Sequence, residues 1–172
     1  MAEAANDDKI TVVIVDDHTI VRQGLRTYLE LQPDVLVVGE AANGNEAMAV
    51  VRDSLPDIVL MDLVMPVMDG VDATRAITAM SPSTRVIVLT SFSEDEKVFA
   101  SIKAGAQGYL MKDVLPSDLV AAIRTVNRGE AQLDPEIARK VMQEFANPQP
   151  VAPKHDLTDR ELEVLRLIAQ GK

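Results

Sequence analysis

Short apolar runs recur along the chain and separate longer segments of mixed polarity. The first four runs are rich in β-branched residues, and their apolar positions are nearly continuous rather than alternating. Such runs are typical of strands that helices cover on both faces, as in a parallel sheet. The predicted strands are 11–15, 35–38, 57–61, 85–90 and the weaker 108–111.

Between these runs, apolar residues recur every three to four positions, which predicts amphipathic helices. The predicted helices lie near 18–31, 45–54 and 69–79, from about residue 94, and around 119–126. Pro116 falls in the first turn of the last of these, where a missing N–H is tolerated. Five strand–helix units predict a doubly wound five-stranded α/β domain over residues 9–128.

The pattern changes after residue 128. An apolar stripe at Ile137, Val141 and Phe145 predicts another helix, and three prolines within 147–153 predict a stiff spacer. We therefore predict a helical and proline-rich linker over 129–156. Thr158 and Glu161 form a capping box that opens a last helix within 157–172.

Composition narrows the classes of function. The chain has 172 residues and no cysteine, which excludes disulfides, thiolate metal sites and a cysteine nucleophile. The net charge is −10, and residues 1–130 hold most of the acidic excess, so this part is not expected to grip a phosphate backbone. No apolar run approaches the ~20 residues of a membrane span, and no signal peptide is recognisable. We expect a cytoplasmic protein that does not contact membranes.

Polar residues follow the carboxyl ends of the predicted strands. Asp16 and Asp17 follow the first strand, Asp62 follows the third, Thr90 ends the fourth and Lys112 follows the fifth. Ligands bind at this edge of an open parallel sheet. If the strand order is 2-1-3-4-5, the three carboxylates crowd one pocket beside a hydroxyl and an ammonium.

Three neighbouring carboxylates need a counter-charge. Each pair repels by ~4 kcal/mol at ~4 Å and an effective dielectric of about 20. Mg²⁺ prefers a few carboxylates together with water and phosphate oxygens. Asp16 and Asp17 alone would be explained as a helix cap, and Thr90 or Lys112 alone as a structural residue. Their convergence on one edge predicts a pocket for a phosphoryl group next to Mg²⁺.

The residues around these positions resemble the receiver domain of two-component response regulators. The resemblance covers residues 9–128 and is carried by 15–18 (VDDH), 60–70 (LMDLVMPVMDG), 89–91 (LTS) and 103–113 (KAGAQGYLMKD). It implies the flavodoxin-like strand order 2-1-3-4-5. It also implies a signalling protein rather than an enzyme.

The resemblance implies roles for the acidic residues. Asp62 would accept a phosphoryl group from the phosphohistidine of a sensor histidine kinase. Asp17, Asp62 and the backbone carbonyl of Val64 would bind Mg²⁺ directly, with Asp16 assisting through water. Such roles suit phosphoryl transfer, which depends on positioning and charge compensation.

The resemblance also implies roles for three further residues. Lys112 would pair with the phosphoryl oxygens, and the Thr90 hydroxyl would bind one of them. Tyr109 would be the switch aromatic that moves with Thr90. His18 is expected to start a helix and not to bind the metal. No proline follows Lys112, so the next peptide bond is expected to be trans.

The segment 157–171 resembles the first helix of a LuxR-type helix-turn-helix domain, which implies a NarL/FixJ-type transcription factor. The later helices, including the recognition helix, are absent from these 172 residues. We therefore expect promoter binding by an intact parent but not by this fragment. The last helix should either fray or dock its apolar residues on another surface, and docking is the favoured outcome. A plain amphipathic helix is the alternative interpretation.

Homodimerisation on phosphorylation is expected, because LuxR-type factors act on paired half-sites. Related regulators use the first and fifth helices for this contact. Arg22, Arg26, Arg124 and Arg128 lie in the corresponding helices here, with few acids beside them in the sequence. Salt bridges alone are therefore not expected to hold the dimer.

Three rival functions fit parts of the sequence. The first is a stand-alone receiver that signals only through protein partners, but this function does not explain why the segment 157–171 resembles a DNA-binding helix. An aspartate-nucleophile phosphohydrolase usually carries Asp-x-Asp at its first strand, whereas Asp16 and Asp17 are adjacent. A flavodoxin-like electron carrier needs a phosphate loop rich in Ser, Thr and Gly after the first strand, and none follows it here. The chain also has no tryptophan, which leaves little to pack against a flavin.

Overall fold

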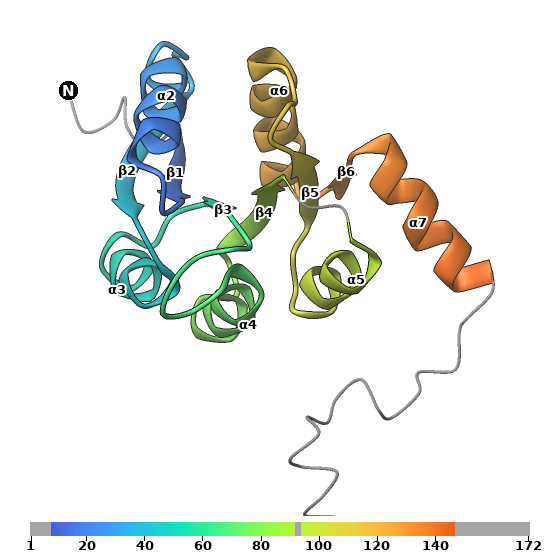
Figure 1. Cartoon of the computed structure of the whole chain (residues 1–172). Coiled ribbons are helices and arrows are strands. Elements are labelled where there is room, and N and C mark those ends of the chain that lie inside the picture. Colours follow the sequence, from blue (N-terminus) through green and yellow to red (C-terminus); the bar gives the residue numbers. More distant parts are fainter. Residues whose placement is uncertain (1–7, 92–93, 147–172) are drawn as a thin grey trace, which may run out of the picture. The chain divides into compact units, whose positions relative to one another are not determined.

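The computed structural model describes residues 8–91 and 94–146. The strands of this part of the chain form one sheet, in which every pair of neighbouring strands is parallel (Figure 1). The order is β2-β1-β3-β4-β5-β6, which confirms the doubly wound fold and the order 2-1-3-4-5 and corrects the predicted five strands to six. The strands are β1 (Ile10–Val15), β2 (Val35–Ala41), β3 (Ile58–Met61), β4 (Arg85–Thr90), β5 (Gly108–Met111) and β6 (Gln132–Leu133).

Helices cover both faces of this sheet. In Figure 1, α2 and α6 lie on one face, and α3, α4 and α5 lie on the other. Each predicted helix of the described part is present, and its ends agree to within the usual uncertainty of helix boundaries. The helices are α2 (Thr19–Glu30), α3 (Gly44–Ser54), α4 (Gly70–Met80), α5 (Asp95–Lys103), α6 (Pro116–Asn127) and α7 (Pro135–Ala146).

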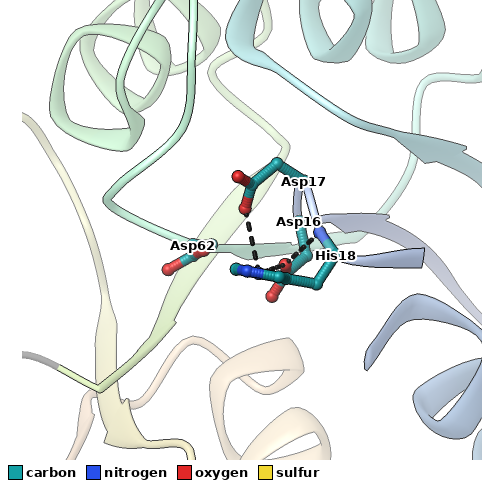
Figure 2. A group of neighbouring side chains, drawn as sticks. All are labelled: Asp16, Asp17, His18 and Asp62. Carbon is teal, nitrogen blue, oxygen red and sulfur yellow. Dashed lines mark hydrogen bonds and ion pairs between the residues drawn. The ribbon is translucent and has the colours of Figure 1, made fainter. Parts of the chain in front are cut away.

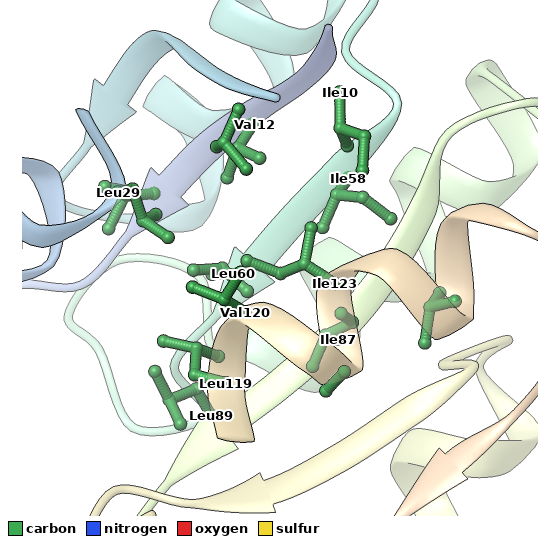
Figure 3. Packing of buried hydrophobic residues seen from close by; sticks show 14 of the residues in the cluster. Ile10, Val12, Leu29, Ile58, Leu60, Ile87, Leu89, Leu119, Val120 and Ile123 are labelled. Atoms are coloured by element: carbon green, nitrogen blue, oxygen red, sulfur yellow. The ribbon is translucent and has the colours of Figure 1, made fainter. Parts of the chain in front are cut away.

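The core lies on both sides of the sheet, which explains the continuous apolar runs. Successive residues of a strand point to opposite faces. Val12 and Ile14 of β1 therefore belong to the cluster under α2 and α6, whereas Val13 and Val15 belong to the cluster under α3 and α4. Figure 3 shows the first cluster, in which α6 contributes Leu119, Val120 and Ile123 and the sheet contributes Leu60, Ile87 and Leu89.

The sixth strand arises from the predicted linker region. The chain turns at Gly129, which has φ +92°, and β6 then pairs with β5 so that Tyr109 lies opposite Leu133. The backbone N–H of Asp134 donates to the Tyr109 carbonyl at 2.9 Å. In the first turn of α7, Ile137 is fully buried. The linker therefore begins as part of the folded domain.

The chain divides into two compact units, residues 1–140 and 141–172, and the sheet lies in the first. The predicted proline-rich spacer and the last helix, with its expected docking, lie outside the described residues. The predicted domain boundaries at 9–128, 129–156 and 157–172 remain predictions. Among the residues described, no helix has the length and apolarity that a membrane crossing requires.

Candidate functional site: an acidic pocket at the carboxyl edge of the sheet

The parallel pairing of β1 with β3 brings two aspartates together. Val15 lies opposite Met61, and the N–H of Asp62 donates to the Val15 carbonyl at 3.0 Å. Asp16 and Asp62, the next residues of the two strands, therefore lie at one edge, where they are 2% and 4% exposed. Figure 2 shows these carboxylates near Asp17 and His18. The predicted convergence of acids is thus present.

Lys112 supplies the cation nearest to the two buried carboxylates. Its Nζ lies 2.7 Å from Oδ2 of Asp16 and 3.3 Å from Oδ2 of Asp62. Burial disfavours the ammonium, but the hydrogen bonds and charges of Asp16 and Asp62 outweigh it and raise the pKa of Lys112. Lys112 therefore stays charged in the pocket and bridges β1 and β3.

Asp62 remains electrostatically strained despite this cation. Burial raises the pKa of its carboxyl group, and the charge of Asp16 raises the pKa further. Lys112 and a hydrogen bond from the Leu63 backbone offset only part of this effect. Ionised Asp62 is therefore costly in the folded protein, and a further positive charge at this point would relieve that cost.

Asp16 and Asp17 are satisfied to different degrees. The Asp16 carboxylate accepts from the backbone N–H of His18 at 2.8 Å through Oδ1 and binds Lys112 through Oδ2. Oδ1 of Asp17 is buried without a hydrogen-bond partner, although Nδ1 of His18 lies 3.1 Å away in an ion-pair contact. A buried carboxylate oxygen needs a partner. Asp17 therefore has an oxygen available for a cation.

The donor set suits a hard divalent cation. One ligand atom from each of Asp16, Asp17, His18 and Asp62 can be chosen so that all lie within 4.8 Å of one another. Carboxylate oxygens are the ligands that Mg²⁺ prefers. Such an ion would give the buried oxygen of Asp17 the partner that it lacks among hydrogen-bond donors, and would offset the cause of the raised pKa of Asp62.

The loop from β3 to α4 runs beside the pocket. Val64 is 44% exposed in this loop, and Val67 adopts a left-handed conformation with φ +72°, which is unusual for a β-branched residue. The N–H of Gly70 donates to the Leu63 carbonyl at 2.8 Å. A Cβ at Gly70 would overlap the Asp62 carbonyl oxygen. Close backbone approach, rather than a positive φ, therefore requires glycine after this turn.

Thr90 and Tyr109 lie on the neighbouring strands β4 and β5, and both are fully buried. The N–H of Lys112 donates to the Thr90 carbonyl at 2.9 Å, which ties the lysine to the end of β4. Burial, followed by the charge of Glu94, raises the pKa of Tyr109 to about 12. The peptide bond after Lys112 is trans, as predicted, since the described residues contain no cis peptide bond.

The arginines predicted for a dimer contact have acidic partners within the chain. Arg26 contacts Glu40 at 2.6 Å and Glu30 at 2.8 Å, and Arg22 contacts Glu40 at 3.4 Å. Arg22 also donates to the backbone carbonyl of Asp16 and is only 16% exposed. The sequence places few acids beside these arginines, and the fold adds Glu40 as a partner because it brings β2 against α2.

The other two arginines are paired as well. Arg124 binds both carboxylate oxygens of Asp34, at 2.7 and 3.0 Å, and Arg128 lies 3.8 Å from Glu130. Asp34 precedes β2 and is far from Arg124 in the sequence. Sequence reasoning could not find this pair, because only the fold brings the start of β2 to α6.

A doubly wound parallel sheet that gathers aspartates and a lysine at its carboxyl edge defines the class of receiver domains. The sequence model of the response regulator receiver domain matches residues 12–124. The chain therefore belongs to the response regulator receiver family.

Two curated relatives extend over most of the chain. It is 44% identical to the transcriptional regulatory protein LiaR of Bacillus subtilis over 95% of this chain and 78% of that protein. It is 42% identical to the response regulator protein VraR of Staphylococcus aureus over 94% and 77%. The chain is thus related to two-component response regulators that regulate transcription.

Solved structures give the same result. A LuxR-family response regulator from Aurantimonas sp. SI85-9A1 superposes with a TM-score of 0.75 at 36% identity, over 81% of this chain and 99% of that one. The isolated receiver domain of RcsB from Salmonella enterica, solved with the phosphomimetic BeF3-, gives 0.70 at 28% identity, over 77% and 98%.

Proposed function

We propose that Asp62 is the phosphoacceptor of a two-component response regulator. One carboxylate oxygen of Asp62 would attack the phosphorus of a phosphohistidine on a sensor histidine kinase. An O–P bond forms, the P–N bond breaks, and the released imidazole takes a proton from water. The supporting observation is the position of Asp62, which is buried at the strand end with Asp16 and Lys112 as neighbours.

The metal in this proposal is Mg²⁺, held by Asp17, Asp62 and the backbone carbonyl of Val64. When bound, Mg²⁺ offsets the negative charge of the carboxylates and the phosphoryl oxygens. Asp16 acts through water in this scheme, because the protein already occupies both of its oxygens. Asp17 ligates directly, since its buried oxygen lacks a hydrogen bond.

Three residues would respond to the phosphoryl group. Lys112 exchanges its contact with Asp62 for the new phosphoryl oxygens, because phosphorylation removes the carboxylate charge that now attracts it. The Thr90 hydroxyl donates to another of these oxygens. Tyr109, which shares the pairing of β4 with β5, follows the movement of Thr90.

Acetyl phosphate tests the assignment of Asp62. Intact-mass spectrometry should find one Mg²⁺-dependent phosphoryl adduct on the wild-type protein and none on Asp62→Ala, because the nucleophile is gone. Asp17→Ala should lower the rate by removing a ligand. Asp53→Asn changes an exposed aspartate of α3 and is the matched control, which should keep the adduct. Full Mg²⁺-dependent labelling of Asp62→Ala would overturn the assignment.

We also propose that phosphorylation controls dimerisation and thereby DNA binding of a transcription factor. LiaR is named as a transcriptional regulatory protein, and the segment 157–171 resembles a LuxR-type first helix. The dimer contact would use α2 and α6. Since Arg124 is paired with Asp34 within one chain, it would present a neutralised surface rather than a free charge.

Multi-angle light scattering tests this second step. Beryllofluoride with Mg²⁺ should shift the wild-type protein from monomer towards dimer, and Arg124→Glu should weaken the shift by placing a repelling acid next to Asp34. Arg75→Glu reverses an exposed charge on α4 and should leave the shift unchanged. A beryllofluoride form that stays monomeric at high micromolar concentration would refute phosphorylation-driven dimerisation.

A further inference from the structure

The ring of His18 lies against the same acidic pocket. His18 precedes α2 as its N-cap residue, as predicted, yet its side chain makes no capping hydrogen bond. Its Nδ1 instead lies 3.1 Å from Oδ1 of Asp16 and 3.1 Å from Oδ1 of Asp17 (Figure 2). The helix start therefore does not account for the orientation of the imidazole.

The local backbone explains how the ring reaches the pocket. The Asp16 carboxylate accepts from the N–H of His18, a bond between residues two apart that folds the chain back on itself. This turn directs Nδ1 towards the oxygens at the end of β1. The His18 side chain is still 66% exposed, so it lies between the acidic group and solvent.

We propose that His18 is a further ligand of the metal site and sets its selectivity for divalent ions. The inference rests on the proposed metal site of Asp17 and Asp62, to which it adds a nitrogen donor. Two observations support it: one ring nitrogen of His18 lies within the group of ligand atoms that share a 4.8 Å limit, and Oδ1 of Asp17, 3.1 Å from Nδ1, lacks a hydrogen bond.

A nitrogen donor changes which ions the site prefers. Mg²⁺ takes oxygen ligands and keeps its waters, so an imidazole adds little to its binding. Imidazole suits later transition metals, and affinity for a given nitrogen and oxygen site rises from Mn²⁺ to Ni²⁺. With His18 as a ligand, the pocket would bind Ni²⁺ much more tightly than an all-oxygen site would, while Mg²⁺ binding would depend on the aspartates.

Ni²⁺ and Mg²⁺ are the probes that test the inference. Calorimetry should find that His18→Ala binds Ni²⁺ at least about tenfold more weakly than the wild type. Loss of a residue that only supports a metal ligand already lowers metal affinity by about tenfold or more, so loss of a ligand should cost at least as much. Mg²⁺ binding, followed by amide chemical shifts, should stay within about twofold. In the wild type, paramagnetic Ni²⁺ should shift or broaden the ring-proton signals of His18 first.

The second histidine of the chain, His155, provides the matched control. His155→Ala should keep wild-type Ni²⁺ affinity, and circular dichroism should confirm that both variants are folded. Equal Ni²⁺ affinity of His18→Ala and wild type would overturn the inference. An equal loss of Ni²⁺ and Mg²⁺ affinity would also overturn it, because His18 would then only position the carboxylates.

Failure of the proposed function would have a different signature. If Asp62→Ala still took up phosphate from acetyl phosphate, the phosphoacceptor assignment would fall. The difference in Ni²⁺ affinity between wild type and His18→Ala would stand, because it does not depend on phosphoryl transfer.

Discussion

The two ends of the sheet are formed by the same strands, yet the polar groups at the two ends differ in how completely they are paired with hydrogen-bond and charge partners. At the amino end, Asp57 accepts from both the N–H and the hydroxyl of Thr11, at 3.0 and 3.1 Å. The Thr84 hydroxyl donates to the Pro56 carbonyl at 2.8 Å and contacts Ser81. These groups have protein partners and leave no evident task for a ligand.

The carboxyl end has the opposite character. Burial raises the pKa of Asp62, and Oδ1 of Asp17 is buried without a hydrogen bond. Unfavourable electrostatics of this kind are typical of functional sites, where pKa values are strongly perturbed. The comparison indicates that the polar groups of the amino end stabilise the fold, whereas those of the carboxyl end favour the binding of a cation.

The largest effect is expected at the carboxyl end from Gly70→Ala. The added Cβ would overlap the backbone at Asp62 and Leu63, which cannot move without displacing the site. We expect a loss of about 3 kcal/mol in the free energy of unfolding, measured by urea titration. Gly24→Ala in α2 meets no atom within 4 Å and should instead gain about 0.5–1 kcal/mol. Similar values for the two variants would contradict the close approach at Gly70.

An intermediate effect is expected at the amino end from Asp57→Ala. The change removes both acceptor contacts to Thr11 and should lower the free energy of unfolding by about 1–3 kcal/mol. Labelling by acetyl phosphate should be unaffected, because Asp57 lies at the opposite end of β3. Loss of labelling in folded Asp57→Ala would break the division between the two ends.

The smallest effect, with the opposite sign, is expected from Asp62→Asn in metal-free buffer. Because the folded pKa of Asp62 is raised above the ordinary 3.8, its ionised form destabilises the fold. This destabilisation grows as the pH rises above about 3.8 and is absent below it. Asp62→Asn should therefore be more stable than wild type at pH 7 and equal to it at low pH. Urea titrations from pH 3 to 8 would show the reverse trend if Asp62 were stabilising.

The sequence predicts those strands and site residues that are marked by a pattern within a short stretch of the chain. The strands from β1 to β5 were found because burial on both faces leaves long apolar runs, and Asp16, Asp62 and Lys112 were found because they end such runs. The strand β6 was missed because Gln132 and Leu133 are too few to show a pattern. Its pairing depends on the edge of β5, which only the assembled sheet provides.

Contacts between distant segments were beyond the sequence. Glu40 reaches Arg26 because β2 continues past the apolar run into polar residues and packs beside α2. The position of His18 in the sequence predicts only that it starts a helix, and it is indeed the N-cap residue of α2. Its contacts with Asp16 and Asp17 result from a turn closed by a side chain, which residue spacing does not reveal.

The short strand β6 also has a consequence for self-association. A strand at the border of a sheet exposes unpaired N–H and C=O groups, to which another chain can add a strand. β6 covers this border at Gly108 and Tyr109, and the ion pair of Lys140 with Asp95, at 3.1 Å, joins α7 to α5. A receiver fragment ending at residue 128 would lose this cover and expose β5. Such a fragment should form insoluble aggregates at concentrations where the longer chain stays clear.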